Sequence, residues 1–117
     1  MSEESRQHKR VKINRKAIII QSTGEKVVAR ACDVSIAGVG IVCDYSCDVG
    51  QTFEIMVNLL GNPKQGLLHV KAQARFLNLI GGMDAYRIGF QIVEFYGNSE
   101  KLLASYIQSR SSQPSWV

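Results

Sequence analysis

Residues 69–76 read His-Val-Lys-Ala-Gln-Ala-Arg-Phe, a strict alternation of polar and apolar residues. Val70, Ala72, Ala74 and Phe76 would point to one side of an extended chain, and the polar residues between them would point to the other. An alternation with a period of two predicts a β-strand that buries one face. We therefore expect a sheet with an apolar inner side.

Two further segments repeat this pattern, one before and one after it. Their inward sets are Phe53, Ile55, Val57 and Leu59 in the first, and Tyr86, Ile88, Phe90 and Ile92 in the second. The residues from Ile92 to Phe95 break the alternation, which predicts a β-bulge or a strand end at that point.

Shorter apolar segments at residues 16–21, 26–31 and 39–43 predict three more strands, and the first two flank a polar loop that contains Gly24. Turn-forming residues separate the six segments. Such spacing is typical of an antiparallel sandwich or a closed barrel, and in a chain of 117 residues a barrel removes exposed strand edges most simply. We predict an all-β fold, a six-stranded antiparallel β-barrel.

The end of the chain changes to helical spacing. Asn98 or Ser99 can cap a helix, and an apolar stripe follows it, formed by Leu102, Leu103, Tyr106 and Ile107. We predict a C-terminal α-helix that packs on the barrel or on a partner. The chain then divides into a flexible basic N-terminal arm (1–15), the barrel with its helix (16–110) and a flexible tail (111–117).

Composition narrows the class of protein. The chain has no apolar run of about 18 residues and no signal-peptide pattern, so we expect a cytoplasmic protein without a membrane span. Three cysteines without a CxxC pair, together with only two histidines, predict reduced thiols and no metal site.

The positive charge is concentrated at the N-terminus. Residues 1–16 hold six of the 14 basic residues and two of the 10 acidic residues, so they account for the whole net charge of +4. A basic arm in front of a neutral body favours an anionic partner such as a phosphate, a nucleic acid or an acidic lipid. A solvated terminus without a partner is the alternative that charge alone leaves open.

No pattern in the chain indicates catalysis. His8 and His69 are far apart and lack a nucleophile motif such as GxSxG. The chain also lacks HExxH, the phosphate-binding GxxxxGK[ST] loop and a GxGxxG turn before a helix. We therefore expect a binding protein and not an enzyme, with no cofactor.

The first of two short binding motifs lies in the arm. Arg6 and Arg10 form an RxxxR pair, with Lys9 between them. Guanidinium groups make paired, charge-assisted bonds to phosphates and to the O6 and N7 edge of guanine. The pair therefore suits a ligand that carries both groups.

The second motif, DxSxxG, is formed by Asp33, Ser35 and Gly38 at a strand end. The aspartate can accept hydrogen bonds from the donor edge of guanine, the serine hydroxyl can donate or accept, and the glycine lets backbone approach a ligand. The same residues would also suit a simple turn between two strands, with Gly38 at positive φ.

Together the motifs resemble those of the PilZ domain family, which pairs an N-terminal RxxxR with a downstream [DN]xSxxG. Gly38-Val39-Gly40-Ile41 is similar to the family's strand after the glycine, and Tyr86-Arg87-Ile88-Gly89-Phe90 is similar to its late-strand pattern. The resemblance covers roughly residues 4–108 and implies a six-stranded barrel with a C-terminal helix.

Membership of this family would make the chain a receptor for cyclic di-GMP that signals through a downstream protein partner. The resemblance implies that the arm arginines hold guanine edges and phosphates, while the second motif binds a guanine. Arg75, on the polar face of its strand, would stack on a base. The implied ligand-binding residues are Arg6, Lys9, Arg10, Asp33, Ser35, Gly38 and Arg75. Family members bind one ligand molecule or an intercalated pair, so the stoichiometry stays open.

Two other functions are compatible with the sequence. A PilZ-like adaptor that no longer binds the ligand would act through protein partners alone, and a small basic barrel could bind nucleic acid. Nucleic acid is disfavoured because most aromatic residues occupy inward strand positions. Both a monomer and a weak homodimer fit the sequence.

Overall fold

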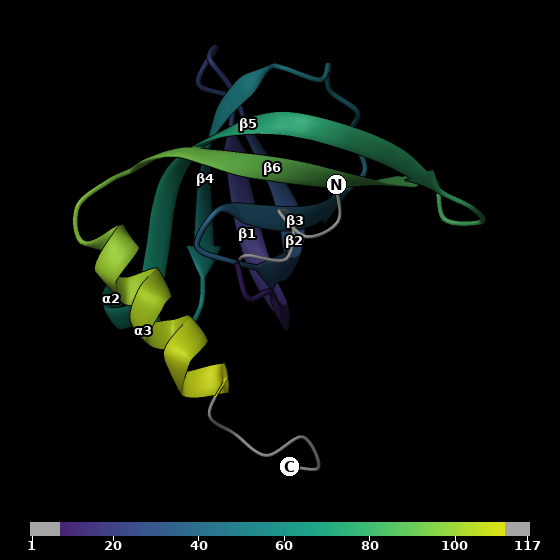
Figure 1. Cartoon of the computed structure of the whole chain (residues 1–117). Helices are drawn as coiled ribbons and strands as arrows, with labels where there is room; N and C mark the ends of the chain where they lie inside the picture. Colours follow the sequence, from purple (N-terminus) through teal and green to yellow (C-terminus); the bar gives the residue numbers. More distant parts are fainter. Residues whose placement is uncertain (1–7, 112–117) are drawn as a thin grey trace.

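The computed structural model describes residues 8–111, and in it the predicted apolar segments form strands (Figure 1). The six strands in this part are β1 (Val11–Ile20), β2 (Lys26–Val34), β3 (Gly38–Cys43), β4 (Thr52–Asn58), β5 (Leu67–Ile80) and β6 (Ala85–Phe95). A single-turn helix, α2 (Pro63–Gly66), precedes β5, and a longer helix, α3 (Ser99–Ser111), follows β6.

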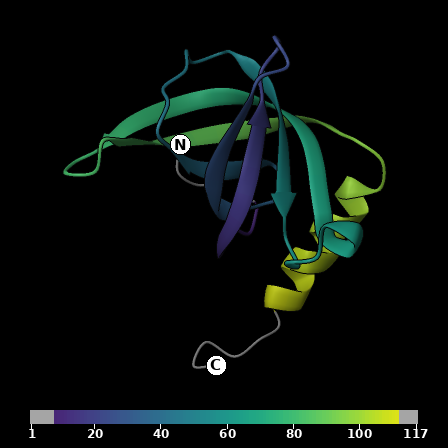
Figure 2. The ribbon, with the colours of Figure 1, turned by 180° about the vertical axis from the view of Figure 1, so that it is seen from behind.

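The strands close into an antiparallel barrel in the order β1-β2-β3-β6-β5-β4, and pairing of β4 with β1 completes it. β3 and β6 are therefore neighbours although they are far apart in sequence. Seen from behind, β1 and β2 lie side by side, across the barrel from β6 and β5 (Figure 2). The predicted six-stranded antiparallel barrel with a C-terminal helix is confirmed.

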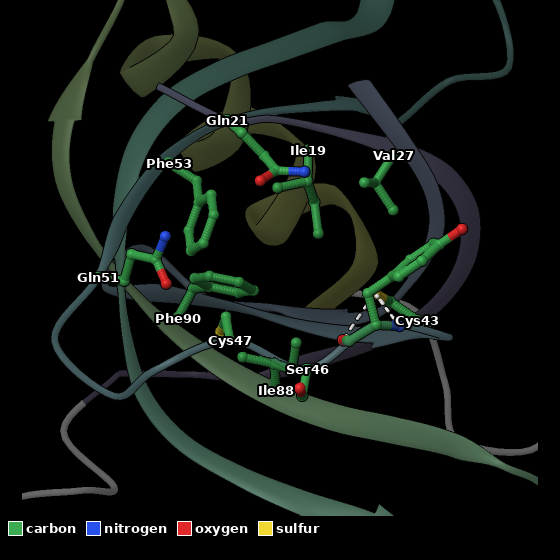
Figure 3. A pocket seen from close by; sticks show the side chains of 11 residues that line it. Ile19, Gln21, Val27, Cys43, Ser46, Cys47, Gln51, Phe53, Ile88 and Phe90 are labelled. Atoms are coloured by element: carbon green, nitrogen blue, oxygen red, sulfur yellow. Dashed lines mark hydrogen bonds between the residues drawn. The ribbon is translucent and has the colours of Figure 1, made fainter. Parts of the chain in front are cut away.

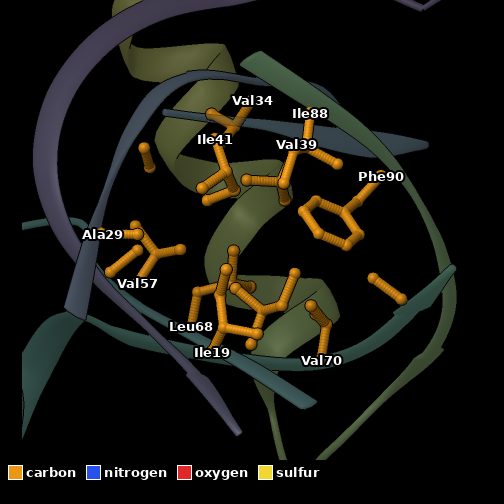
Figure 4. Packing of buried hydrophobic residues seen from close by; sticks show 14 of the residues in the cluster. Ile19, Ala29, Val34, Val39, Ile41, Val57, Leu68, Val70, Ile88 and Phe90 are labelled. Atoms are coloured by element: carbon orange, nitrogen blue, oxygen red, sulfur yellow. The ribbon is translucent and has the colours of Figure 1, made fainter. Parts of the chain in front are cut away.

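Aliphatic side chains fill the barrel (Figure 4). The predicted inward set of β4 is confirmed, since Ile55 and Val57 are fully buried, and so is that of β6, where Ile88 and Phe90 are buried. Helix α3 covers one end of the core with Leu103, which is 0% exposed. The apolar stripe predicted for this helix therefore packs on the barrel.

The fold differs from the expectation at the start of β1. The strand begins at Val11, not at Lys16, because the pairing with β2 starts with Val11 opposite Val34. The register of this pair shifts between Lys12 and Arg15. Such an irregularity interrupts the period of two, so the sequence pattern did not reveal the first residues of the strand.

The inward position predicted for Phe76 is wrong. The register between β5 and β6 shifts between Ala74 and Phe76, and this bulge turns Phe76 to the outer face, where its side chain is 47% exposed. A second shift between Lys71 and Ala72 places Val93 outside the ladder, which confirms the irregularity predicted between Ile92 and Phe95.

Strands β5 and β6 continue past the barrel wall as a projecting hairpin (Figures 1 and 2). β4 pairs with β5 only from Leu67 to Gln73, whereas β6 pairs with it as far as Ile80. The hairpin turn contains Gly82 and Asp84, both with positive φ (80° and 46°). Glycine and aspartate tolerate this backbone conformation better than most residues.

Hydrogen bonds join both ends of α3 to the barrel. The backbone N–H of His69 donates to Ser99 Oγ at 2.9 Å, and Arg110 donates to the Lys12 carbonyl at 3.0 Å. Within the helix, Arg110 also donates to the Tyr106 hydroxyl at 2.7 Å.

Within residues 8–111, no helix combines the length and the apolar character needed to cross a membrane.

Candidate functional site

Asp33 lies near the end of β2 and binds two arginines from distant parts of the chain. Arg10, just before β1, donates from Nη1 to Asp33 Oδ1 at 2.6 Å, and Arg87 of β6 donates from Nη2 to Asp33 Oδ2 at 2.6 Å. The carboxylate is almost buried, whereas the arginine side chains are 55% and 40% exposed. A nearly buried acceptor thus holds two partly exposed cations, in short charge-assisted bonds.

The environment of Arg87 fixes its guanidinium further. Its Nη1 donates to Cys32 Sγ at 2.9 Å. The hydrogen bond to Asp33 raises the pKa of Arg87 above its ordinary value, and partial burial opposes this shift. Burial, followed by the charge of Asp33, raises the pKa of Cys32, so this thiol stays protonated at neutral pH.

Ser35 organises the turn between β2 and β3. Its side chain is buried, and its Oγ accepts the backbone N–H groups of Ala37 and Gly38, each at 3.1 Å. The backbones of Ser35 and Gly38 also exchange hydrogen bonds across the turn, at 2.8 and 3.3 Å. The hydroxyl therefore stabilises the loop that borders the candidate site.

Gly38 is needed at this turn for space. It does not adopt the positive φ considered for it; instead, a Cβ there would lie 2.5 Å from the Phe90 carbonyl oxygen of β6. Any larger residue would push β3 away from β6. The glycine of the second motif thus permits the close approach of two strands, a structural role that stands beside the ligand contact predicted for it.

Replacing Ser35 with alanine should lower the free energy of unfolding by about 1–2 kcal/mol, because buried N–H groups lose an acceptor. Urea denaturation measures this change. Ser46→Ala is the matched control, since Ser46 is exposed in a loop and should tolerate the replacement. Equal stability of the two variants would contradict a structural role for the Ser35 hydroxyl.

Two glycines form the floor of the site. Cross-strand pairing places Asp33 opposite Gly40, Gly40 opposite Gly89, and Gly89 opposite Phe76. A Cβ on Gly40 would lie 2.7 Å from Asp33 Oδ1, and a Cβ on Gly89 would overlap the Phe76 ring. The Asp33 carboxylate therefore lies against Gly40 and the Phe76 ring against Gly89, at opposite ends of one row of residues.

A groove of about 940 Å³ runs over this floor on the outer wall of the barrel. Its basic side chains come from the start of the described chain, from β5 and from β6: His8, Arg10, Arg75 and Arg87. None of the described residues that line the groove is acidic. Its size suits a small ligand, and its charge suits an anionic one.

Arg75 lies at the far side of the groove from Arg10. Its side chain is exposed on β5, as its polar strand position predicts, and its Nη1 donates to Gln91 Oε1 at 2.8 Å. Phe76, the next residue, also lines the groove. This side therefore offers both a guanidinium plane and an aromatic ring, each able to stack on a base.

A second cavity lies at one mouth of the barrel (Figure 3). It measures only about 70 Å³, and the described residues that line it include no charged side chain. Phe53 and Phe90 meet beside it edge to face, with ring centroids 5.9 Å apart. It is too small for a nucleotide, so the outer groove is the better candidate.

Most of the predicted site residues gather at the outer groove. Arg10, Ser35, Gly38 and Arg75 line it, and Asp33 holds two of its arginines. Lys9 is exposed but is not among the lining residues, and Arg6 lies outside the residues that the structure describes.

Two residues of the groove, Arg87 and Phe76, are not among the predicted site residues. The sequence places Arg87 at an outward strand position within the family's late-strand pattern, and its proximity to Asp33 depends on the pairing of β3 with β6. No spacing along the chain indicates that pairing. The alternation places Phe76 in the core because it does not reveal the bulge before this residue.

The fold and the groove define a class of protein: small closed β-barrels with a basic groove on the outer wall. The chain belongs to the PilZ domain family, whose model matches residues 4–109. A comparison with curated protein sequences found no match.

Several solved structures share the fold. The inhibitor of motility MotI/DgrA of Bacillus subtilis superposes with a TM-score of 0.76 at 15% identity, covering 90% of this chain and 50% of that one. The PilZ domain of YcgR from Escherichia coli with c-di-GMP gives 0.69 at 19% identity, covering 90% of both chains. The complex of K. pneumonia MrkH with c-di-GMP gives 0.71 at 12% identity, covering 88% and 51%. The chain thus spans about half the length of MotI and MrkH.

Proposed function

We propose that this chain is a non-catalytic receptor for cyclic di-GMP, which binds in the outer groove between the N-terminal arm and the β2–β3 turn. The main support is the pair of arginines, Arg10 and Arg87, that Asp33 holds beside a groove in which none of the described lining residues is acidic. Two of the similar structures were solved with c-di-GMP, which supports the same ligand class here.

Asp33 has a double role in this proposal. Without ligand, its carboxylate is satisfied by the two arginines. A carboxylate offers about four acceptor positions, so Asp33 can also accept the N1–H and N2 amino donors of a guanine. Arg10, which is the more exposed of the two arginines, would then turn toward a phosphate or the O6 and N7 edge, while Arg87 keeps its hydrogen bond to Asp33 Oδ2.

The remaining predicted residues complete the binding site. Arg6 and Lys9 bring further positive charge from the arm, and Ser35 and Gly38 hold the turn beside the ligand. Arg75 would stack on a base at the far side of the groove. Ordering of the arm over bound ligand would present a new surface to a downstream protein, as in other systems where folding accompanies binding.

Guanine selectivity follows from the acceptor character of Asp33. Adenine does not offer the paired N–H donors that guanine presents to a carboxylate, so cyclic di-AMP should bind at least about tenfold more weakly, a difference of roughly 1.4 kcal/mol. Competition titrations with the two dinucleotides measure this ratio. Equal affinities would mean that the groove recognises phosphate alone.

Calorimetric titration of the full chain tests the proposed function itself. We expect a Kd of roughly 0.1–10 µM for cyclic di-GMP, about −7 to −9.5 kcal/mol, and no comparable heat with GMP. No heat at about 100 µM cyclic di-GMP would contradict the receptor function, since a ligand with this affinity would saturate the protein. The adaptor function without ligand would then be preferred.

A further inference from the structure

Among residues 8–111, the projecting part of β5 has one edge without a strand partner. On its β4 side, the last backbone hydrogen bonds in this part of the chain join Ala74 to Gly50 and Gln51, at 2.7 and 2.9 Å. Beyond Ala74, the described residues pair with β5 only from the β6 side, up to Ile80. A strand edge left in this way can accept another strand.

The sequence of this edge lacks charge and proline, two of the features that usually prevent strand pairing. Residues 76–80 read Phe-Leu-Asn-Leu-Ile, and the bulge of β5 lies just before them, between Ala74 and Phe76. Phe76 is 47% exposed and Leu79 is 65% exposed. Exposed edges of this composition usually need protection by charge, proline or coverage.

We propose that two copies of this chain form a dimer, in which their β5 edges pair antiparallel about a two-fold axis at Asn78. In this register, residues that meet across the axis lie on the same face of the joined sheet. Phe76, which lies over Gly89 on the outer face, meets Ile80 of the other copy, and Leu77, which packs toward the core, meets Leu79.

The self-complementarity of the segment favours a second copy as the occupant. Each apolar residue meets an apolar residue, and the two Asn78 side chains face one another, where an amide can both donate and accept. The charged Arg75 falls outside the paired residues, so no like charges are opposed. In a two-fold arrangement the β5 edge of each copy pairs with the β5 edge of the other. No further copy can add at these edges, so the assembly would not extend into a fibre.

Sedimentation of the full chain without ligand tests the proposal. We expect the mass to rise from 13.0 kDa toward twice that value as the concentration increases from about 10 to 500 µM. Leu79→Lys places a charge opposite an apolar partner in each copy, so it should raise the dimer Kd at least about tenfold. Val28→Lys also replaces an exposed aliphatic residue with lysine, but on β2, and should leave the equilibrium unaltered.

A cross-linking experiment tests the register. Directly opposed residues of antiparallel strands have Cβ atoms about 4.5–5.5 Å apart, close to the reach of a disulfide. Asn78→Cys should therefore give a covalent dimer under mild oxidation, whereas the unaltered chain and Val28→Cys should not. A single 13.0 kDa species over the whole concentration range would overturn the proposal, as would a dimer that Leu79→Lys does not weaken.

Discussion

Replacing Asp33 with alanine should weaken the binding of cyclic di-GMP by about 2–4 kcal/mol, roughly 30- to 900-fold. The side chain is almost buried and is held by Arg10 and Arg87. Its removal would take away the proposed guanine acceptor and would also release both arginines from their hydrogen bonds to the carboxylate. Calorimetry of the variant, with a thermal melt to show that it is folded, measures the loss.

Two variants separate the causes of this loss. Asp33→Asn keeps an acceptor oxygen but removes the charge, so we expect it to lose less affinity than the alanine variant. Asp48→Ala removes the same charge from an exposed loop and should change affinity little. Equal effects of Asp33→Ala and Asp48→Ala would show that Asp33 contributes only to the overall charge.

The second large effect is expected for Arg10→Lys. Lysine keeps the positive charge but loses the planar fork, so affinity should fall by about 1–3 kcal/mol, roughly 5- to 150-fold. The same loss is expected for Arg6→Lys if both arginines of the motif contact the ligand. The barrel should stay folded, because Arg10 precedes β1 and its side chain is more than half exposed. Titration of each variant at physiological salt provides the measurement.

Arg15→Lys is the matched control for Arg10→Lys. Arg15 is exposed on β1 and is not among the residues that line the groove, so the same chemical change should have little effect there. Lys16→Ala removes a charge nearby, and its small effect should shrink further with added salt. Comparable losses for Arg10→Lys and Lys16→Ala would indicate diffuse attraction of an anion instead of a specific contact.

The barrel could be predicted from the sequence because its inner face imposes a period of two. Val57 and Ile88 are buried where the alternation places them. The prediction failed where the ladder is irregular: the register shift in β1 concealed its start, and the bulge in β5 turned Phe76 outward. Bulges depend on pairing between strands, which a single sequence shows only weakly.

The candidate site was only partly predictable for the same physical reason. The two motifs identified Arg10 and Asp33, which the structure joins directly. Arg87 and the glycine floor depend on the pairing of β3 with β6, which joins residues 43 to 53 positions apart along the chain. Long-range pairing of this kind leaves no local pattern, so the sequence does not indicate that Arg87 lies beside Asp33.

The most direct test of the receptor function is a ¹⁵N NMR titration of the full chain with cyclic di-GMP. We expect chemical-shift changes at the backbone amides of the groove, above all Ser35, Gly40, Gly89 and Gln91, with little change at the barrel mouth around Cys47. No shifts at about 100 µM ligand would contradict the proposed receptor function, because a Kd of roughly 0.1–10 µM predicts near saturation at that ligand concentration. Shifts confined to the barrel mouth would contradict it equally.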